Sequence, residues 1–203
     1  MNEIFREWTR RARRKGITAV MSVRHSDEEN LSAPEKMKLD VLNFLGRNYG
    51  SLEGKRILEL GCGIGRFTRE LALRASNVTA VDMTLGMLER AKDYTADITN
   101  ITYINSRITD LDALPEFDIV FETITLLHIL DEKEYRKSLE IMKSAAPYIF
   151  ICEHMADSAP VSPYSKLRTF EQYEQDFKPF KLIAYDKNHY CAGDWFPMML
   201  FKK

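Results

Sequence analysis

ILELGCGIGRFT, residues 57–68, decides the fold of this chain. Its first part, together with Arg56, is typical of a short strand buried in a sheet. The glycines at positions 61, 63 and 65 then predict a sharp turn, because glycine adopts backbone conformations that other residues avoid. The residues from Arg66 onward have the pattern of a helix. The stretch therefore predicts a strand, a tight glycine turn and a helix in direct succession.

The same alternation continues toward the C-terminus. Helical patterns separate most of the further predicted strands, and this order favours a parallel sheet covered by helices on both faces. Two later extended runs are predicted either as a hairpin at the sheet edge or as strands that flank another strand. The expected fold class is α/β, doubly wound and mostly parallel, with an antiparallel C-terminal strand. The predicted strands are VTAVD (78–82), ITYIN (101–105), FDIVFET (117–123) and PYIFICE (147–153), and the later runs are KLIAYDK (181–187) and WFPMMLFKK (195–203).

A length of 203 residues predicts one domain, residues 1–203, because the remainder is too short to fold alone. Residues 1–50 are expected to form a helical N-terminal extension. Its second helix is predicted to begin at Ser32, after a polar loop, since Ser32 and Glu35 have capping-box spacing and Pro34 suits a first turn. The basic run RRARRK at residues 10–15 is interpreted as a solvated helix face.

The composition excludes several classes of protein. Hydrophobic residues make up 45% of the chain and charged residues 29%, which is ordinary for a globular protein. The net charge of −1 gives no basic field for nucleic acid or an anionic membrane. The three cysteines and four histidines are scattered, so neither a disulfide framework nor a metal site is predicted. We expect a cytoplasmic protein, because the start is charged and no apolar run is long enough to cross a bilayer.

The glycine turn indicates a nucleoside ligand without a diphosphate. A dinucleotide fingerprint, GxGxxG, needs glycine at position 66, where this chain has an arginine that obstructs a pyrophosphate. Asp82 ends the second predicted strand, where a carboxylate can accept both hydroxyls of a ribose. Glu59 stands two residues before the first glycine, repels phosphate and suits a ligand with a positive charge.

These residues resemble class I S-adenosylmethionine-dependent methyltransferases, which have a Rossmann-like sheet. ILELGCGIGRFT is similar to the first motif of that family, AVDMTLGMLERAK to its second, and FDIVFETITLLHIL to its fourth strand and the segment after it. The resemblance implies an enzyme with S-adenosyl-L-methionine as its cofactor. It covers about half of the chain.

The resemblance also assigns site residues. It places Glu59, Gly61, Cys62 and Gly63 around the methionine part of the cofactor, and Asp82 on the ribose. Met83 lies beside the adenine, and Glu122 ends the strand that borders methionine and acceptor. The family often has an Asp-Ala-like pair against the adenine, whereas this chain has Arg107 and Ile108 there. Arg24 and His25 are candidates for the methionine carboxylate, with an ordinary surface loop as the alternative.

The acceptor side is predicted from topology. A sulfonium is already activated, so alignment of acceptor and methyl group can supply most of the acceleration. Glu153 and His154 follow the fifth strand at the carboxyl edge and are the candidate acid–base residues. His128 is interpreted as structural. Residues 153–175 are expected to form an acceptor-side cover in which Tyr164 and Arg168 contact the acceptor.

Three functions stay open at this point. The first is methyl transfer to a small molecule, and the second is methylation of a protein, for example at its N-terminus. The third, of another class, is a non-catalytic protein that binds S-adenosylmethionine. Methylation of nucleic-acid bases is not expected, because Glu122-Thr123-Ile124-Thr125 stands where an NPPY-like tetrapeptide would be needed. The sequence fixes neither the acceptor atom nor the oligomeric state.

Overall fold

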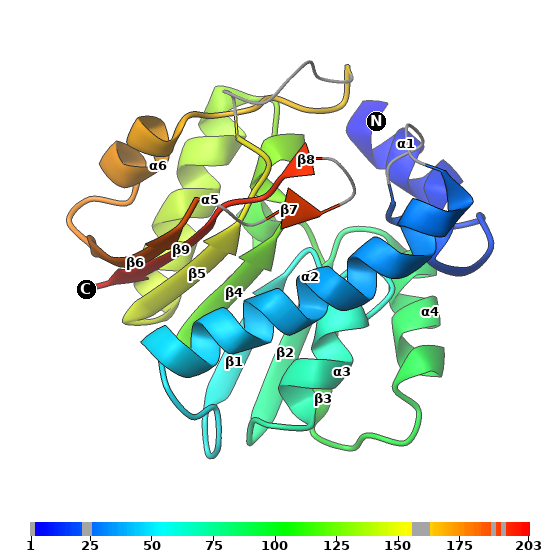
Figure 1. Cartoon of the computed structure of the whole chain (residues 1–203), viewed down its shortest axis with the longest axis horizontal. Helices are drawn as coiled ribbons and strands as arrows, with labels where there is room; N and C mark the ends of the chain where they lie inside the picture. Colours follow the sequence, from blue (N-terminus) through cyan, green and yellow to red (C-terminus); the bar gives the residue numbers. More distant parts are fainter. Residues whose placement is uncertain (1–2, 22–25, 156–162, 188–189, 192–193) are drawn as a thin grey trace.

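A computed structural model describes residues 3–21, 26–155, 163–187, 190–191 and 194–203 of the chain. One seven-stranded sheet has the order β3-β2-β1-β4-β5-β9-β6 and runs through the centre of Figure 1. The strands from β3 to β5 are parallel, and β9 is antiparallel to both of its neighbours. A two-stranded ribbon of β7 and β8 stands apart from the sheet. The strands are β1 Arg56–Leu60, β2 Asn77–Asp82, β3 Ile101–Asn105, β4 Ile119–Thr123, β5 Tyr148–Cys152, β6 Lys181–Asp186, β7 Tyr190–Cys191, β8 Asp194–Trp195 and β9 Met198–Lys202.

Helices cover both faces of the sheet. On one face, α2, α3 and α4 contribute buried side chains to the same apolar cluster as Ile57 of β1. On the other face, α5 and α6 pack with Leu58 and Leu60 of the same strand. Successive residues of a strand point to opposite faces, so a strand buried on both sides needs an unbroken apolar run. The helical segments are α1 Glu3–Arg11, η1 Gly16–Ala19, α2 Asp27–Asn48, α3 Arg66–Ala72, α4 Leu85–Tyr94, η2 Ile108–Asp110, η3 Leu126–His128, α5 Glu132–Ala145 and α6 Phe170–Asp176.

The C-terminal strands resolve the two alternatives left by the sequence. β6 and β9 pair directly and antiparallel, with Leu182 opposite Phe201. β9 also pairs with β5, so it enters the sheet and leaves β6 at the edge. The predicted fold class, a mostly parallel doubly wound sheet with an antiparallel C-terminal strand, is therefore confirmed.

The predicted start of the second helix is wrong. α2 begins at Asp27, five residues before Ser32, and Pro34 lies inside it. The Ser32 hydroxyl donates to the Glu28 carbonyl at 3.0 Å, as serine does within a helix, and so it does not cap a helix end. Packing of the apolar side chains from Met37 to Leu45 against the sheet outweighs the one hydrogen bond that proline removes.

The N-terminal segment is tied to α4 (Figure 1). The Arg90 guanidinium of α4 donates to the carbonyls of Ala12 at 3.3 Å, Arg14 at 2.9 Å and Gly16. The guanidinium therefore holds three carbonyl oxygens of residues 12–16 against α4. Within the described parts of the chain, no helix has the length and apolar character needed to span a membrane.

Candidate active site

The candidate site lies at the carboxyl ends of β1, β2 and β4. The chain order reverses between β1 and β4, and open α/β sheets bind ligands at such a switch point. The glycine turn follows β1, with φ of +71° at Gly61, +54° at Gly63 and +84° at Gly65. The Gly61 and Cys62 amides both donate to the Val81 carbonyl, at 2.8 and 3.0 Å, and fix the turn on β2. The predicted sharp turn is therefore present.

The glycine turn has no room for a Cβ atom at Gly61 and little room for one at Gly63. A Cβ atom at Gly61 would lie 2.0 Å from the Thr125 hydroxyl oxygen, on the segment after β4. The same hydroxyl donates to the Leu60 carbonyl at 3.3 Å, which holds it there. A Cβ atom at Gly63 would lie 3.1 Å from Val20 of the N-terminal segment. The turn thus meets the β4 segment on one side and the N-terminal segment on the other.

Asp82 is the acid at the end of β2, as predicted. Its Oδ2 accepts from the Gly63 amide at 3.0 Å, and its Oδ1 accepts from the Thr84 amide at 2.8 Å. Burial raises the pKa of Asp82, and these two backbone hydrogen bonds oppose the rise. Each carboxylate oxygen keeps a second lone pair, so the group can still accept two ligand hydroxyls.

Glu59 is buried, with 3% of its surface exposed, on the α2 and α3 face of the sheet. Its Oε2 has no hydrogen-bond partner among the described residues. Burial raises the pKa of Glu59 to about 7, while Thr68 and Arg66 lower it. A buried acceptor without a donor is costly, and a cationic ligand that donates a hydrogen bond would relieve that cost. This orphaned oxygen fits a cofactor that carries an ammonium and a sulfonium.

The remaining predicted cofactor residues divide into two groups. Cys62 and Met83 stand directly beside the glycine turn and Asp82, with Cys62 buried and Met83 half-buried. Arg107 instead forms an ion pair with Glu134 of α5, and Ile108 is buried in the apolar cluster that packs under α5. Contact of all four with a cofactor stays a prediction.

Two carboxyls meet behind the segment that follows β4. Glu122 and Glu153 are both fully buried, and both accept a hydrogen bond from the Thr125 amide, at 2.5 and 2.9 Å. Glu122 pairs in register with Leu60 of β1, so its side chain lies on the α5 and α6 face, opposite to Glu59. The predicted position of Glu122, bordering the methionine part and the acceptor, stays a prediction, and its pairing with Glu153 was not predicted. The available signal was two acids at the ends of adjacent parallel strands.

His128 joins three segments of the chain: α1, the segment after β4 and the segment before α6. Its Nδ1 lies 2.7 Å from the Tyr164 carbonyl, and its ring meets that of Trp8 edge to face, with 4.9 Å between the ring centroids. Burial lowers the pKa of His128 to about 4, so the imidazole is neutral. A carbonyl oxygen only accepts, so Nδ1 carries the proton and Nε2 has a lone pair. Trp8 and Tyr164 thus approach each other across His128.

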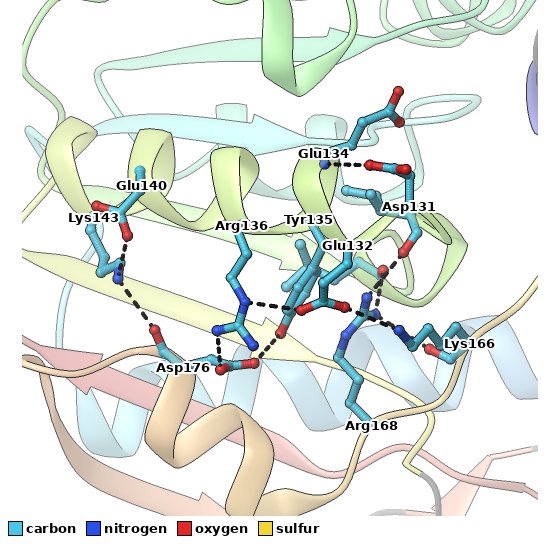
Figure 2. A network of polar contacts seen from close by, with 12 residues as sticks. Asp131, Glu132, Glu134, Tyr135, Arg136, Glu140, Lys143, Lys166, Arg168 and Asp176 are labelled. Atoms are coloured by element: carbon cyan, nitrogen blue, oxygen red, sulfur yellow. Dashed lines mark hydrogen bonds and ion pairs between the residues drawn. The ribbon is translucent and has the colours of Figure 1, made fainter.

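Arg168 lies under the chain that links β4 to α5. Its guanidinium donates to the carbonyls of Leu126 and Ile129, both at 3.0 Å, and sits 3.4 Å from the centre of the Tyr135 ring. Figure 2 shows it beside a network in which Lys166 contacts Glu132, and in which Tyr135 and Arg136 contact Asp176. Only 3% of Arg168 is exposed, and its observed hydrogen bonds support the main chain of this segment. Contact with an acceptor stays a prediction.

The other predicted acceptor-side residues are placed in part. His154 is buried beside Phe196, with 5.2 Å between the ring centroids. Tyr164 takes part through its main-chain carbonyl. Arg24 and His25, and residues 156–162 of the predicted cover, lie outside the described residues. The group of acceptor residues expected from the sequence is therefore only partly visible.

Comparison with known proteins agrees with this architecture. Residues 57–146 match a family described as a methyltransferase domain. Phosphoethanolamine N-methyltransferase 1 of Triticum aestivum is 33% identical over 152 residues, which cover 65% of this chain and 30% of that protein. Malonyl-[acyl-carrier protein] O-methyltransferase 1 of Ilyobacter polytropus is 24% identical over 177 residues, which cover 80% of this chain and 65% of that protein. The chain spans less than a third of the plant relatives' length.

Two crystal structures share the fold. N-methyltransferase NodS of Bradyrhizobium japonicum, in complex with S-adenosyl-L-homocysteine, has a TM-score of 0.80 at 14% identity, over 100% of this chain and 99% of that chain. Phosphoethanolamine N-methyltransferase 1 of Haemonchus contortus has a TM-score of 0.75 at 19% identity, over 98% of this chain and 48% of that chain. The domain match over residues 57–146, the sheet order and the glycine turn between two acids agree: this chain contains a methyltransferase domain and has the fold of these methyltransferase structures.

Proposed function

We propose that this chain transfers a methyl group from S-adenosylmethionine to the nitrogen of a small amine. The cofactor, when bound, supplies a methyl group that its sulfonium has already activated. Asp82 holds the ribose hydroxyls, and Glu59 accepts from the cationic methionine part. The main chain from Gly61 to Gly63 lies against the ligand. The orphaned Glu59 Oε2 is the observation that carries this assignment.

The charge of the site favours an amine acceptor. Glu59 and Asp82 lie beside the glycine turn, whereas Glu122 and Glu153 are fully buried behind the β4 segment. The two acids beside the glycine turn, Glu59 and Asp82, favour a cationic or polar amine over a carboxylate. Five of the similar plant proteins are named phosphoethanolamine N-methyltransferases, which agrees with an amine. The named malonyl O-methyltransferases make a carboxyl acceptor the second candidate.

An aliphatic ammonium must lose its proton before its nitrogen can attack the methyl group. His128 is a candidate for that proton through Nε2, because Nδ1–H is held by the Tyr164 carbonyl; its lowered pKa makes it a weak base in the absence of ligand. Glu153 and His154, the candidates from the sequence, remain the alternatives. Trp8 and the Tyr164 segment meet at His128 and would shield the reaction from water.

The test is a methyl-transfer assay on the purified chain with four acceptors. These are phosphoethanolamine, ethanolamine, a malonyl thioester and a peptide with a free α-amine. Mass spectrometry then locates the added methyl group. Methylation of an amine nitrogen in a small molecule supports the proposal. Methylation of the malonyl carboxyl or of the peptide alone contradicts the acceptor class. Binding of S-adenosylhomocysteine with no transfer to any acceptor favours the non-catalytic alternative.

A further inference from the structure

The carboxyls of Glu122 and Glu153 converge on one short segment of main chain. Glu122 Oε1 accepts from the Thr125 and Leu126 amides at 2.5 and 3.1 Å. Glu153 Oε1 accepts from the Thr125 and Leu127 amides at 2.9 and 3.3 Å. Three consecutive amides are therefore held by two side chains from neighbouring strands. Neither glutamate is exposed to solvent, so the pair belongs to the interior of the molecule.

The segment held in this way has a strained residue at its start. Ile124 has a φ of +55°, a left-handed conformation that is rare for a β-branched residue. Such a conformation persists only where the surroundings determine it strongly. The Ile124 amide donates to the Cys152 carbonyl at 2.9 Å, and the two carboxyls hold the amides that follow. The turn then brings Thr125 against Gly61, so its shape decides how the β4 segment meets the glycine turn.

The pair has two acceptor oxygens without a donor. Glu122 Oε2 and Glu153 Oε2 are both buried and have no hydrogen-bond partner among the described residues. The side chains nevertheless interact with each other. Burial raises the pKa of both, and Glu153 raises that of Glu122 further, whereas the hydrogen bond with Glu122 lowers that of Glu153. One carboxylic acid O–H donated between the two oxygens would satisfy both at once. It would also leave one negative charge where two would repel.

The charged and titratable groups around the pair do not replace that proton. Tyr173 of α6 and Tyr135 of α5 lie near it; burial raises the pKa of each, and the charge of Glu153 adds to the rise. Arg168 is the nearby cation, and it donates to the carbonyls of Leu126 and Ile129 on the same segment. The segment is thus held through its amides by the two glutamates and through its carbonyls by the arginine.

We propose that Glu122 and Glu153 are positioning residues that share one proton and hold the left-handed turn at Ile124 in the shape that seats Thr125 against the glycine turn. Loss of that proton places two charges side by side and loosens the turn. The affinity for the cofactor therefore falls as the pH rises above neutral. The inference rests on the proposed cofactor site but requires no particular acceptor.

The test compares Glu122→Gln with Glu122→Ala, and uses Glu116→Gln, which changes an exposed acid, as the control. A glutamine amide donates permanently to Glu153 and replaces the shared proton, whereas alanine removes the support. S-adenosylhomocysteine affinity is measured by calorimetry at neutral and alkaline pH. Hydrogen exchange of the Thr125 to Leu127 amides is followed in the same samples. Any titration of Glu59 is common to all variants and cancels in the comparison.

We expect the wild type and Glu116→Gln to lose affinity together as the pH rises. Glu122→Gln should keep neutral-pH affinity and lose the alkaline decline. Glu122→Ala should bind about tenfold more weakly, as for an unsatisfied buried group, and should exchange these amides faster. An alkaline decline in Glu122→Gln equal to that of the wild type would overturn the proposal, as would unchanged exchange in Glu122→Ala. If Glu122→Ala does not fold, the pH dependence of Glu122→Gln decides. If the wild type binds no cofactor, the proposed function fails, and amide exchange across the same pH range still tests the pair.

Discussion

Replacing Gly61 by alanine tests the central claim that the glycine turn and the β4 segment are in direct contact. With φ at +71°, an alanine at this position costs about 1–2 kcal/mol in backbone strain. Its Cβ would lie 2.0 Å from Thr125 Oγ1, 2.7 Å from Cγ2 and 2.8 Å from Cβ. Overpacking of this kind costs roughly 1–3 kcal/mol more, because Thr125 must move. The expected destabilisation is therefore about 2–5 kcal/mol, the sum of the two effects.

Gly54→Ala is the matched control. Gly54 has a φ of +73°, and a Cβ atom there would meet no atom within 4 Å, so only the strain of about 1–2 kcal/mol remains. Urea denaturation gives the free energy of unfolding of both variants, and calorimetry gives their affinity for S-adenosylhomocysteine. Gly61→Ala should bind more weakly, while Gly54→Ala should bind as the wild type does. Adding Thr125→Ala to Gly61→Ala should recover part of the lost stability. Equal stability and equal affinity of the two single variants would refute the reasoning.

Three further predictions follow from individual side chains. Burial raises the pKa of Glu59 from 4.5 to about 7, so its protonation stabilises the folded state by about 3 kcal/mol below pH 4.5, and this contribution is lost as the pH rises through 7. In urea denaturation, Glu59→Gln should flatten this decline of the free energy of unfolding with pH, and an unchanged decline would contradict the prediction. Burial lowers the pKa of His128 from 6.5 to about 4, so the stability that the neutral imidazole contributes is lost as the pH falls from 6.5 through 4. His128→Asn, whose amide can still donate to the Tyr164 carbonyl, should keep cofactor affinity and lose most methyl transfer. Full activity of this variant would exclude His128 as the base. Arg168→Met removes the donors to two buried carbonyls and should lower the free energy of unfolding by about 2–4 kcal/mol; a raised KM for the acceptor with unchanged stability would instead support the contact predicted from the sequence.

The fold was predictable because its determinants are local and repeated. Each parallel strand is a short apolar run, and each is followed by turn residues and a helical pattern. The start of α2 was not predictable in the same way. Ser32 and Pro34 are strong local signals for a helix start, but the packing of Met37 and the residues after it extends the helix across them. At this position tertiary packing outweighs the local sequence signals for a helix start.

The acids at the ends of β1 and β2 could be placed from the sequence because the strand ends place them. The hydrogen-bond partners of Arg168 could not be predicted from the sequence. An arginine before α6 is equally compatible with a ligand contact and with a structural role. The direction of its side chain depends on where the helix packs. The geometry at Ile124 was also hidden, because no residue preference marks an isoleucine for a left-handed turn. Both features arise from contacts between segments far apart in the chain.

The division of tasks among the acids follows from strand register. Leu60 lies opposite Glu122 in the parallel pair of β1 and β4, and Glu59 lies opposite Phe121. Neighbours in register share a face, so Glu59 points toward α3, whereas Glu122 points toward α5 and α6. Two acids at the same edge of one sheet are thus separated by the sheet itself. One is left with an unpartnered oxygen beside the glycine turn, where a cationic ligand can satisfy it. The other, Glu122, accepts from main-chain amides of the β4 segment through Oε1, and its own Oε2, which has no hydrogen-bond partner among the described residues, lies on the α5 and α6 face, away from the glycine turn. A charge near a strand end therefore indicates a ligand only when its face of the sheet is known.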